Sequence, residues 1–297
     1  MKIYKKLGYN KMHLKKLMNS NNGVVGIVVA VLLIGLLVTF ISIIQLYYVP
    51  KWMKEKEAEH MTLVSNQFAQ LKFAIDSQIA LGNLGKIGIP MTSPFTLGST
   101  EIPFFVSMPA YGQLDIIDND CNITFYGDIT KSYSLGIIRF SSINAYLEDQ
   151  SFVYESGAII TSQTEGNIVA VKPFFKPNLT GGEFKINFAL IDISSVGGKT
   201  TSQTSTDATA IQTEYSSNQP APYIIYEVDS ITIDTEYPTA WHLFIDSILK
   251  NAGTEEDAYS IYEPAPNQTI IKFNDLPTII IEEYRINAQI GPGWIQQ

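Results

Sequence analysis

Three Asn-x-Thr triplets are the residues of this sequence whose type and spacing point most directly to chemistry. They begin at Asn122, Asn178 and Asn267, and each has a threonine two positions later. This is the acceptor pattern for N-linked glycosylation, a modification of surface asparagines in proteins that leave the cytoplasm. Such triplets also arise by chance at about this density. The rest of the chain must therefore show whether these positions lie outside the cell.

Two groups of acidic residues could in principle hold a metal ion. Asp115, Asp118 and Asp120 form the first group, and residues 255–257 form the second. Their spacing is not that of an EF-hand loop, and no central glycine is present. We therefore interpret the first group as a solvated acidic turn and the second as the acidic first turn of a helix. The sequence predicts no metal site.

Catalytic motifs are absent from the sequence. The sequence contains no nucleophile elbow, H-E-x-x-H helix, P-loop or Rossmann glycine turn. Residues 196–201 end like a P-loop but lack its first glycine, and a flexible loop is the better interpretation. His13, His60 and His242 lie far apart, and Cys121 is the only cysteine, which excludes an intramolecular disulfide and a cluster of transition-metal ligands. We predict a protein that is not an enzyme and has no cofactor, although the paired carboxylates of a glycosidase stay open because the fold sets their spacing.

The element that must organise the chain is the apolar stretch at residues 24–49, which carries no charge. About 20 apolar residues suffice to cross a bilayer, and a helix is the structure that satisfies its own backbone there. Residues 1–23 form a basic leader that contains no acid. Because lysines favour the cytoplasmic side, we expect a single-pass protein with a cytoplasmic N-terminus and an extracellular C-terminal part. The leader lysines are Lys2, Lys5, Lys6, Lys11, Lys15 and Lys16.

The charge balance of the remainder is strongly acidic. The chain has a net charge of −9, and removing the six leader lysines leaves about −15 for the rest. An acidic exterior argues against nucleic acids and anionic lipid surfaces as partners. The predicted lipid partner is the bilayer around the apolar helix.

The junction between leader and helix resembles a class III, prepilin-type signal peptide. Lys15-Lys16, then Asn22-Gly23, then an uncharged helix is the order found in type IV pilin-like proteins. The resemblance implies that a prepilin-type peptidase cuts between Gly23 and Val24 and that the helix then contacts other pilin-like subunits. Bacterial pilins usually carry a glutamate where this chain has Val28, so the likeness is closer to archaeal pilins and archaellins. A plain uncut signal anchor is the alternative.

A second, shorter likeness lies in the later part of the chain. Residues 138–160 resemble uncharacterised archaeal membrane-anchored pilin-like proteins.

Residues 50–82 have the periodicity of an amphipathic helix. One stripe is apolar except for Glu57, and we expect it to dock against the globular part of the protein. Pro50 either starts this helix or kinks a continuous one, and Gly82 and Gly85 end it. The stripe consists of Met53, Glu57, Met61, Val64, Phe68, Leu71, Ile75 and Ile79. The opposite face carries Lys54, Glu55, Glu59, Gln67, Gln70 and Lys72.

Residues 83–297 are predicted to form a β-rich external domain, antiparallel and sandwich-like, with one or two short helices. We expect loops and short strands over 87–130, a hairpin over 157–171, a clear strand at 183–193 and a Ser/Thr-rich loop at about 196–221. We also expect a bulged strand at 223–235, a helix at 240–252 that Gly253 ends, and a closing hairpin over 269–288.

Taken together, the sequence predicts an α+β protein with a membrane helix, an amphipathic stem and a β-rich head. The resemblance implies the function of a type IV pilin-like cell-surface glycoprotein, a minor or tip pilin or a pseudopilin, acting in filament assembly or surface adhesion. Gly26, Ala30 and Gly35 would let neighbouring helices approach closely in a filament. The alternatives are a membrane-anchored extracellular binding protein that never polymerises and, from another class, a surface hydrolase.

Overall fold

The structure is a computed structural model that describes residues 22–85, 89–99, 108–180, 183–197, 201–216, 219–255 and 257–291. The basic leader over residues 1–21 lies outside the described residues. The chain divides into two compact units, the first containing residues 22–52 and the second beginning at residue 53.

The first unit is helical throughout. It comprises α2 (Asn22–Ile43), the π-helical turn η1 (Ile44–Tyr48) and the start of α3 (Val49–Asn83). In the π-turn the Val49 N–H donates to the Ile44 carbonyl, five residues earlier. Pro50 follows at once, and its ring cannot donate and would crowd the carbonyl four residues before it. The widened turn therefore accommodates Pro50 without ending the helix.

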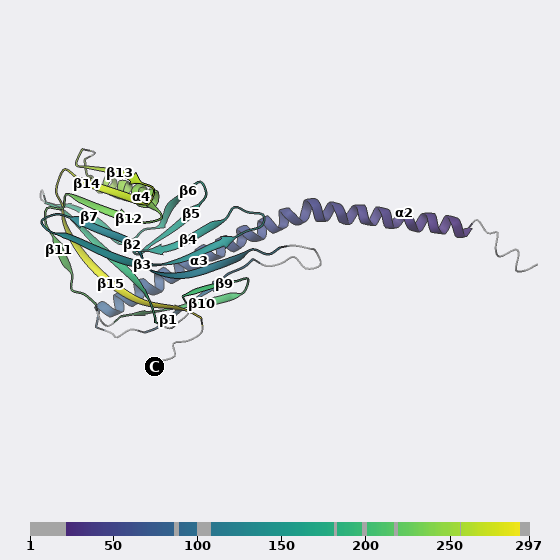
Figure 1. Ribbon diagram of the computed structural model, residues 1–297, viewed down its shortest axis with the longest axis horizontal. Helices are drawn as coiled ribbons and strands as arrows, with labels where there is room; N and C mark the ends of the chain where they lie inside the picture. The colour runs from purple at the N-terminus through teal and green to yellow at the C-terminus, as the bar shows by residue number, and fades with distance from the viewer. Residues whose placement is uncertain are drawn as a thin grey trace, which may run out of the picture. The chain divides into compact units, whose positions relative to one another are not determined.

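The second unit contains two sheets dominated by antiparallel pairing, together with α3 and the short helix α4 (Pro238–Asn251) (Figure 1). This confirms the α+β layout. Sheet A contains β1 (Met91–Thr96), β7 (Phe175–Thr180), β8 (Glu183–Ser195), β10 (Ala208–Tyr215), β11 (Tyr223–Ile225) and β15 (Thr278–Ile290). Sheet B contains β2 (Tyr111–Tyr126), β3 (Thr130–Ile143), β4 (Gln150–Glu155), β5 (Ala158–Gln163), β6 (Gly166–Val171), β9 (Ser202–Ser205), β12 (Ser230–Asp234), β13 (Tyr259–Ala265) and β14 (Gln268–Phe273).

Sheet A runs in the order β1-β10-β15-β8-β7, with β11 also on β15, and sheet B runs β13-β14-β12-β2-β3-β4-β5-β6, with β9 also on β2. The expectation of purely antiparallel pairing is wrong at one place, because β15 pairs parallel to β8 from Thr278 opposite Lys185 onward. Parallel strands need a long crossover, and here the strands from β9 to β14 supply it.

The expected closing hairpin over 269–288 is also wrong. β14 pairs with β12 and β13 in sheet B, whereas β15 lies in sheet A. The same change of sheet corrects the long strand expected at 223–235. β11 pairs with β15, β12 pairs with β2 and β14, and Glu227 between them has a φ of +48°. The shift in alternation therefore marks a crossing between sheets and not a bulge.

Two segments contain more strand than composition predicted, one expected to hold loops and short strands and the other a loop. β2 is a 16-residue strand within the stretch 87–130, with a register shift between Ile117 and Cys121. In the Ser/Thr-rich stretch, β9 pairs with β2 and β10 pairs with β1 and β15. Short polar side chains suit strands whose faces are partly exposed, so composition alone misplaced them. The hairpin β5–β6, the strand β8 and the helix α4, followed by Gly253 at a φ of +81°, are confirmed.

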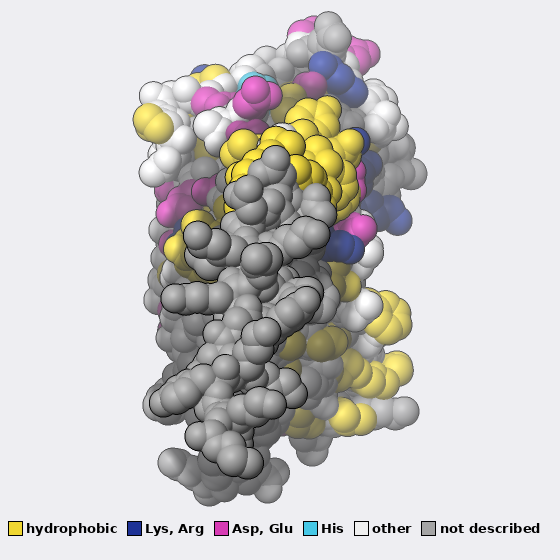
Figure 2. Space-filling model, turned by 90° about the vertical axis from the view of Figure 1, so that its right-hand side faces the viewer, with side chains coloured by type: hydrophobic (Ala, Val, Ile, Leu, Met, Phe, Trp, Pro, Cys, Tyr) yellow, Lys and Arg dark blue, Asp and Glu magenta, His cyan; other side chains and the backbone are white. Residues whose placement is uncertain are grey.

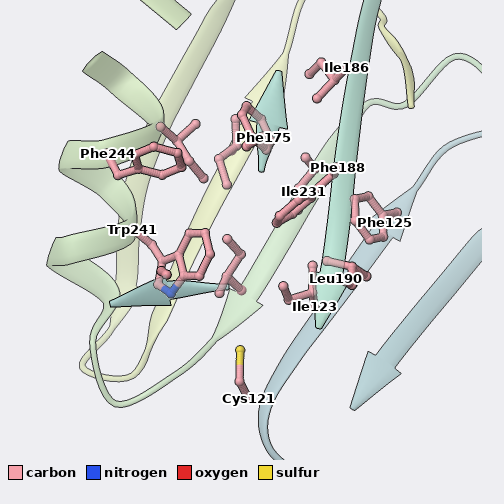
Figure 3. Packing of buried hydrophobic residues seen from close by; sticks show 14 of the residues in the cluster. Cys121, Ile123, Phe125, Phe175, Ile186, Phe188, Leu190, Ile231, Trp241 and Phe244 are labelled. Atoms are coloured by element: carbon pink, nitrogen blue, oxygen red, sulfur yellow. The ribbon is translucent and has the colours of Figure 1, made fainter. Parts of the chain in front are cut away.

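Two apolar clusters hold the second unit together. In the first, Trp241 and Phe244 point from α4 toward Phe175 and Phe188 of sheet A (Figure 3). In the second, the apolar stripe of α3 packs against side chains from both sheets. The expected docking of this stripe is thus confirmed, Glu57 included, which is fully buried. Gln67, expected on the solvent face, is buried as well and exchanges hydrogen bonds with Thr96.

Candidate functional site

The surface of α2 is the most unusual chemical feature of the first unit. Its large apolar side chains lie on all sides of the helix, with 49–68% of each exposed. Figure 2, which looks along this helix, shows them as one continuous apolar mass. Thr39 and Ser42 turn their hydroxyls back onto the carbonyls of Gly35 and Val38, each at 2.8 Å. From Val24 onward the helix therefore satisfies its own side-chain hydroxyls and presents an apolar surface to its surroundings.

An aromatic group marks the end of the apolar stretch. The rings of Tyr47 and Tyr48 lie 5.2 Å apart, and those of Tyr48 and Trp52 lie 5.8 Å apart. Lys51 lies between Tyr48 and Trp52 in the sequence, and Lys54 follows Trp52. Tyrosine and tryptophan concentrate where a bilayer meets water. By length and composition, one helix among the described residues is long and apolar enough to span a membrane.

The residues of the expected peptidase site lie in the first turn of α2. Gly23 and Val24 are its second and third residues, and Val24 is 65% exposed. Farther along the helix, a Cβ added at Gly26 or at Gly35 would meet no atom within 4 Å. A second helix could therefore approach the backbone at both glycines.

The three sequon asparagines are all exposed, and two of them are close together. Asn122 lies on β2 and Asn267 in the turn between β13 and β14, and Asp234 of β12 pairs with Asn122 on one side and Gln268 on the other. Asn178 lies apart from them, on the edge strand β7 of sheet A. The proximity of Asn122 and Asn267 depends on strand pairing, so the sequence pattern could not reveal it.

The first acidic group lies on a strand and not in the expected turn, with Asp115 buried and Asp118 exposed. Asp115 and Asp118 lie on β2, where their carboxylates accept hydrogen bonds from Ser202 Oγ at 2.6 Å and from the Ser195 backbone N–H at 2.7 Å. They hold the connection between β8 and β9 against β2. The second group does not begin a helix, since residues 252–258 lie between α4 and β13 and Glu256 is outside the described residues.

Two buried carboxylates have unusual surroundings that sequence analysis missed as sites. Glu57 accepts three backbone hydrogen bonds, from Ala145 at 2.9 Å, Tyr146 at 3.0 Å and Leu147 at 2.6 Å. The one feature of the sequence that pointed to a role for Glu57 was its position as the polar member of an apolar helical stripe. Its carboxylate closes the loop between β3 and β4 onto α3.

Glu155, at the end of β4, is the second. Its carboxylate accepts hydrogen bonds from Trp241 Nε1 at 2.6 Å and from Thr235 Oγ1 at 2.8 Å. Burial raises the pKa of Glu155 to about 7, and the hydrogen bonds from Trp241, Thr235 and the Cys121 thiol oppose that rise. Burial also raises the pKa of Cys121 well above its usual value, which makes this thiol a poor nucleophile. The Glu155 carboxylate can take up a proton near neutral pH, but the side chain is fully buried.

The two histidines among the described residues, His60 and His242, lie on different helices. His60 is buried with its Nε2 2.8 Å from the Thr96 carbonyl, and burial lowers its pKa. His242 lies on α4, 2.8 Å from Glu263. Within the described ranges no group of three or more His, Cys, Asp and Glu side chains could hold a metal ion. Comparison with protein-family models, curated proteins and solved structures finds no match to this chain.

Proposed function

We propose that this protein is a type IV pilin-like cell-surface protein of the archaeal kind, anchored by α2 and acting in filament assembly or adhesion. The observation that carries the proposal is the surface of α2 from Val24 to Ile43, which is apolar on every side and whose two hydroxyl groups are bonded to the helix's own carbonyls. Such a surface is stable only in lipid or against other apolar helices. A pilin-like helix occupies both environments in turn.

The orientation follows from charge. Six lysines precede α2 and no acid does, which favours a cytoplasmic leader. The aromatic group at Tyr47, Tyr48 and Trp52 then marks the outer interface, and the acidic remainder is extracellular. The exposed sequons would lie in the compartment where glycans are attached.

Processing and assembly complete the mechanism. A prepilin-type peptidase removes the leader at the Gly23–Val24 bond, and with it six charges that would cost several kcal/mol to bring into an apolar filament core. The open backbone at Gly26 and Gly35 would then let α2 pack against the helices of other subunits.

A second candidate is a membrane-anchored binding protein that does not polymerise. Two adjoining hollows lined by Asn83, Glu282 and Tyr284 support it, because a subunit that only fills a filament needs no ligand site on its head.

The deciding experiment is the N-terminal residue of the mature protein, measured by mass spectrometry of membranes from the native host. We expect Val24 in the wild type and a retained leader in Gly23→Leu, since only a small residue fits the peptidase. Gly35→Leu is the matched control and should be processed normally. A mature wild-type protein that begins at Met1 would remove the pilin-like mechanism and leave the anchored binding protein.

A further inference from the structure

Two adjoining hollows form a groove on the second unit, where the C-terminal turns of α3 lie beside β8 and β15. Their volumes are about 500 Å³ and about 310 Å³. Asn83, Glu282 and Tyr284 line both hollows, so the two adjoin at these three side chains. We call this feature the Tyr284 groove.

Aromatic rings contribute to both halves of the groove. Phe174, in the connection between β6 and β7, lines the larger hollow and is 56% exposed, although nothing in the core requires a phenylalanine there. Tyr215 of β10 lines the smaller hollow together with Pro220 and Pro222. Tyr284 stands between them. Flat, rigid rings at intervals along a groove suit a ligand made of repeated units that each present an apolar face.

The polar atoms at the centre of the groove are held in place and still have bonding capacity. The Tyr284 hydroxyl donates to Glu282 Oε2 at 2.7 Å and accepts from Asn83 Nδ2 at 3.1 Å. Among the residues that the structure describes, none donates a hydrogen bond to Glu282 Oε1 or to Asn83 Oδ1. These two acceptors are fixed by Tyr284 and remain available for the hydroxyl groups of a ligand.

The mixed charges of the groove favour neutral ligands over strongly charged ones. In the larger hollow, Lys72 pairs with Asp76 at 3.0 Å, and Lys172 and Glu282 balance each other in sign. Lys172 forms no ion pair within the described part of the chain. The smaller hollow adds Glu283, which Arg285 pairs at 2.8 Å. An anion would meet Asp76 and the glutamates, and a cation would meet the lysines.

We propose that the Tyr284 groove binds a neutral oligosaccharide. The C–H faces of its sugar rings would stack on Phe174, Tyr284 and Tyr215. Its hydroxyls, which both donate and accept, would donate to Glu282 and Asn83 and accept from Lys172. The inference rests on the proposed function only for its location, because an extracellular head would meet such glycans on other cells or surfaces.

The test uses the purified full-length protein in detergent micelles and four immobilised neutral tetrasaccharides: maltotetraose, cellotetraose, mannotetraose and N-acetylchitotetraose. A tetragalacturonate and a neutral hexapeptide are probed alongside. We expect binding to at least one neutral tetrasaccharide and a loss of about tenfold in affinity in Phe174→Ala. Glu282→Gln, which keeps the shape but exchanges an acceptor for a donor, should weaken the same interaction.

Phe73→Ala is the matched control, since Phe73 is 74% exposed and lines neither hollow. It should bind like the wild type, and thermal melting should show that Phe174→Ala, at an exposed position, folds normally. Binding of tetragalacturonate or of the peptide alone, binding that Phe174→Ala leaves unchanged, or no binding of any neutral tetrasaccharide would each overturn the proposal. The assay does not depend on leader removal, so its failure is separable from failure of the pilin-like mechanism.

Discussion

Replacing Glu155 by glutamine should change how the stability of the second unit depends on pH. The wild-type carboxyl is fully buried, and its pKa rises from 4.5 to about 7 on folding because of that burial. Glutamine has nearly the same shape and keeps a carbonyl that can accept from Trp241 Nε1, but it does not titrate. The comparison therefore isolates the ionisation of this one group.

The direction in which the free energy of unfolding changes with pH follows from the protons that each state binds. Between pH 4.5 and about 7 the folded state holds a proton on Glu155 that the unfolded state has already lost. The stabilisation of the folded state that comes from the raised pKa of Glu155 is fully present below pH 4.5, and it is lost as the pH rises through about 7. Since each pKa unit is worth about 1.4 kcal/mol, the rise corresponds to about 3 kcal/mol. The free energy of unfolding of the wild type, relative to that of Glu155→Gln, should thus fall by about 3 kcal/mol between pH 4 and pH 8.

Urea unfolding of the full-length protein in micelles, followed by tryptophan fluorescence, measures this difference. Trp241 is a direct reporter because it donates to Glu155. Thr235→Val removes a donor that favours the ionised form, so it should raise the pKa of Glu155 further and extend the pH window upward. Parallel stability curves for the wild type and Glu155→Gln, or a difference that grows with pH, would refute the assignment of a raised pKa.

Three further results are expected. Glu57→Ala should cost about 2–4 kcal/mol and accelerate hydrogen exchange at residues 145–147, because it leaves three backbone N–H groups without their acceptor, whereas Glu59→Ala should leave that exchange unchanged. Gly136→Ala should cost about 3 kcal/mol or prevent folding, as judged by the urea midpoint against Gly197→Ala, because its Cβ would lie 1.9 Å from the Ile193 carbonyl oxygen. Replacing all three sequon asparagines by glutamine should lower the apparent mass of the protein from the native host, and an unchanged mass would exclude their glycosylation. Those residues are Asn122, Asn178 and Asn267.

Helical periodicity was the most informative sequence signal. The stripe from Met53 to Ile79 fixed which side of α3 is buried, because a period of 3.6 residues follows from the helix itself and needs no knowledge of the partner. The α4 helix and the β5–β6 hairpin were predictable for the same reason, since their signals are local.

Strand pairing was beyond the sequence because alternation shows which face is buried and not which strand lies alongside. β8 and β15 pair in parallel although six strands separate them along the chain, and no residue in either marks that choice. The Tyr284 groove could not be predicted from the sequence for the same reason, because it depends on strand pairing. Asn83, Phe174, Tyr215 and Tyr284 come from four distant segments, so the site exists only after β8, β10 and β15 have assembled.

The two buried carboxylates show what a break in a hydrophobic pattern can mean. A purely apolar stripe on α3 could rotate or slide by a residue against the sheets with little loss, because apolar contact is not directional. Glu57 forbids this, since a rotation of one residue would leave its buried carboxylate and three backbone N–H groups unpaired. Glu155 joins β4 to α4, 86 residues away, under the same constraint. Each carboxylate loses solvation on burial, and each is stable in one arrangement of distant segments only. We infer that Glu57 sets the position of the stem helix in the head and that the apolar residues around it supply the stability.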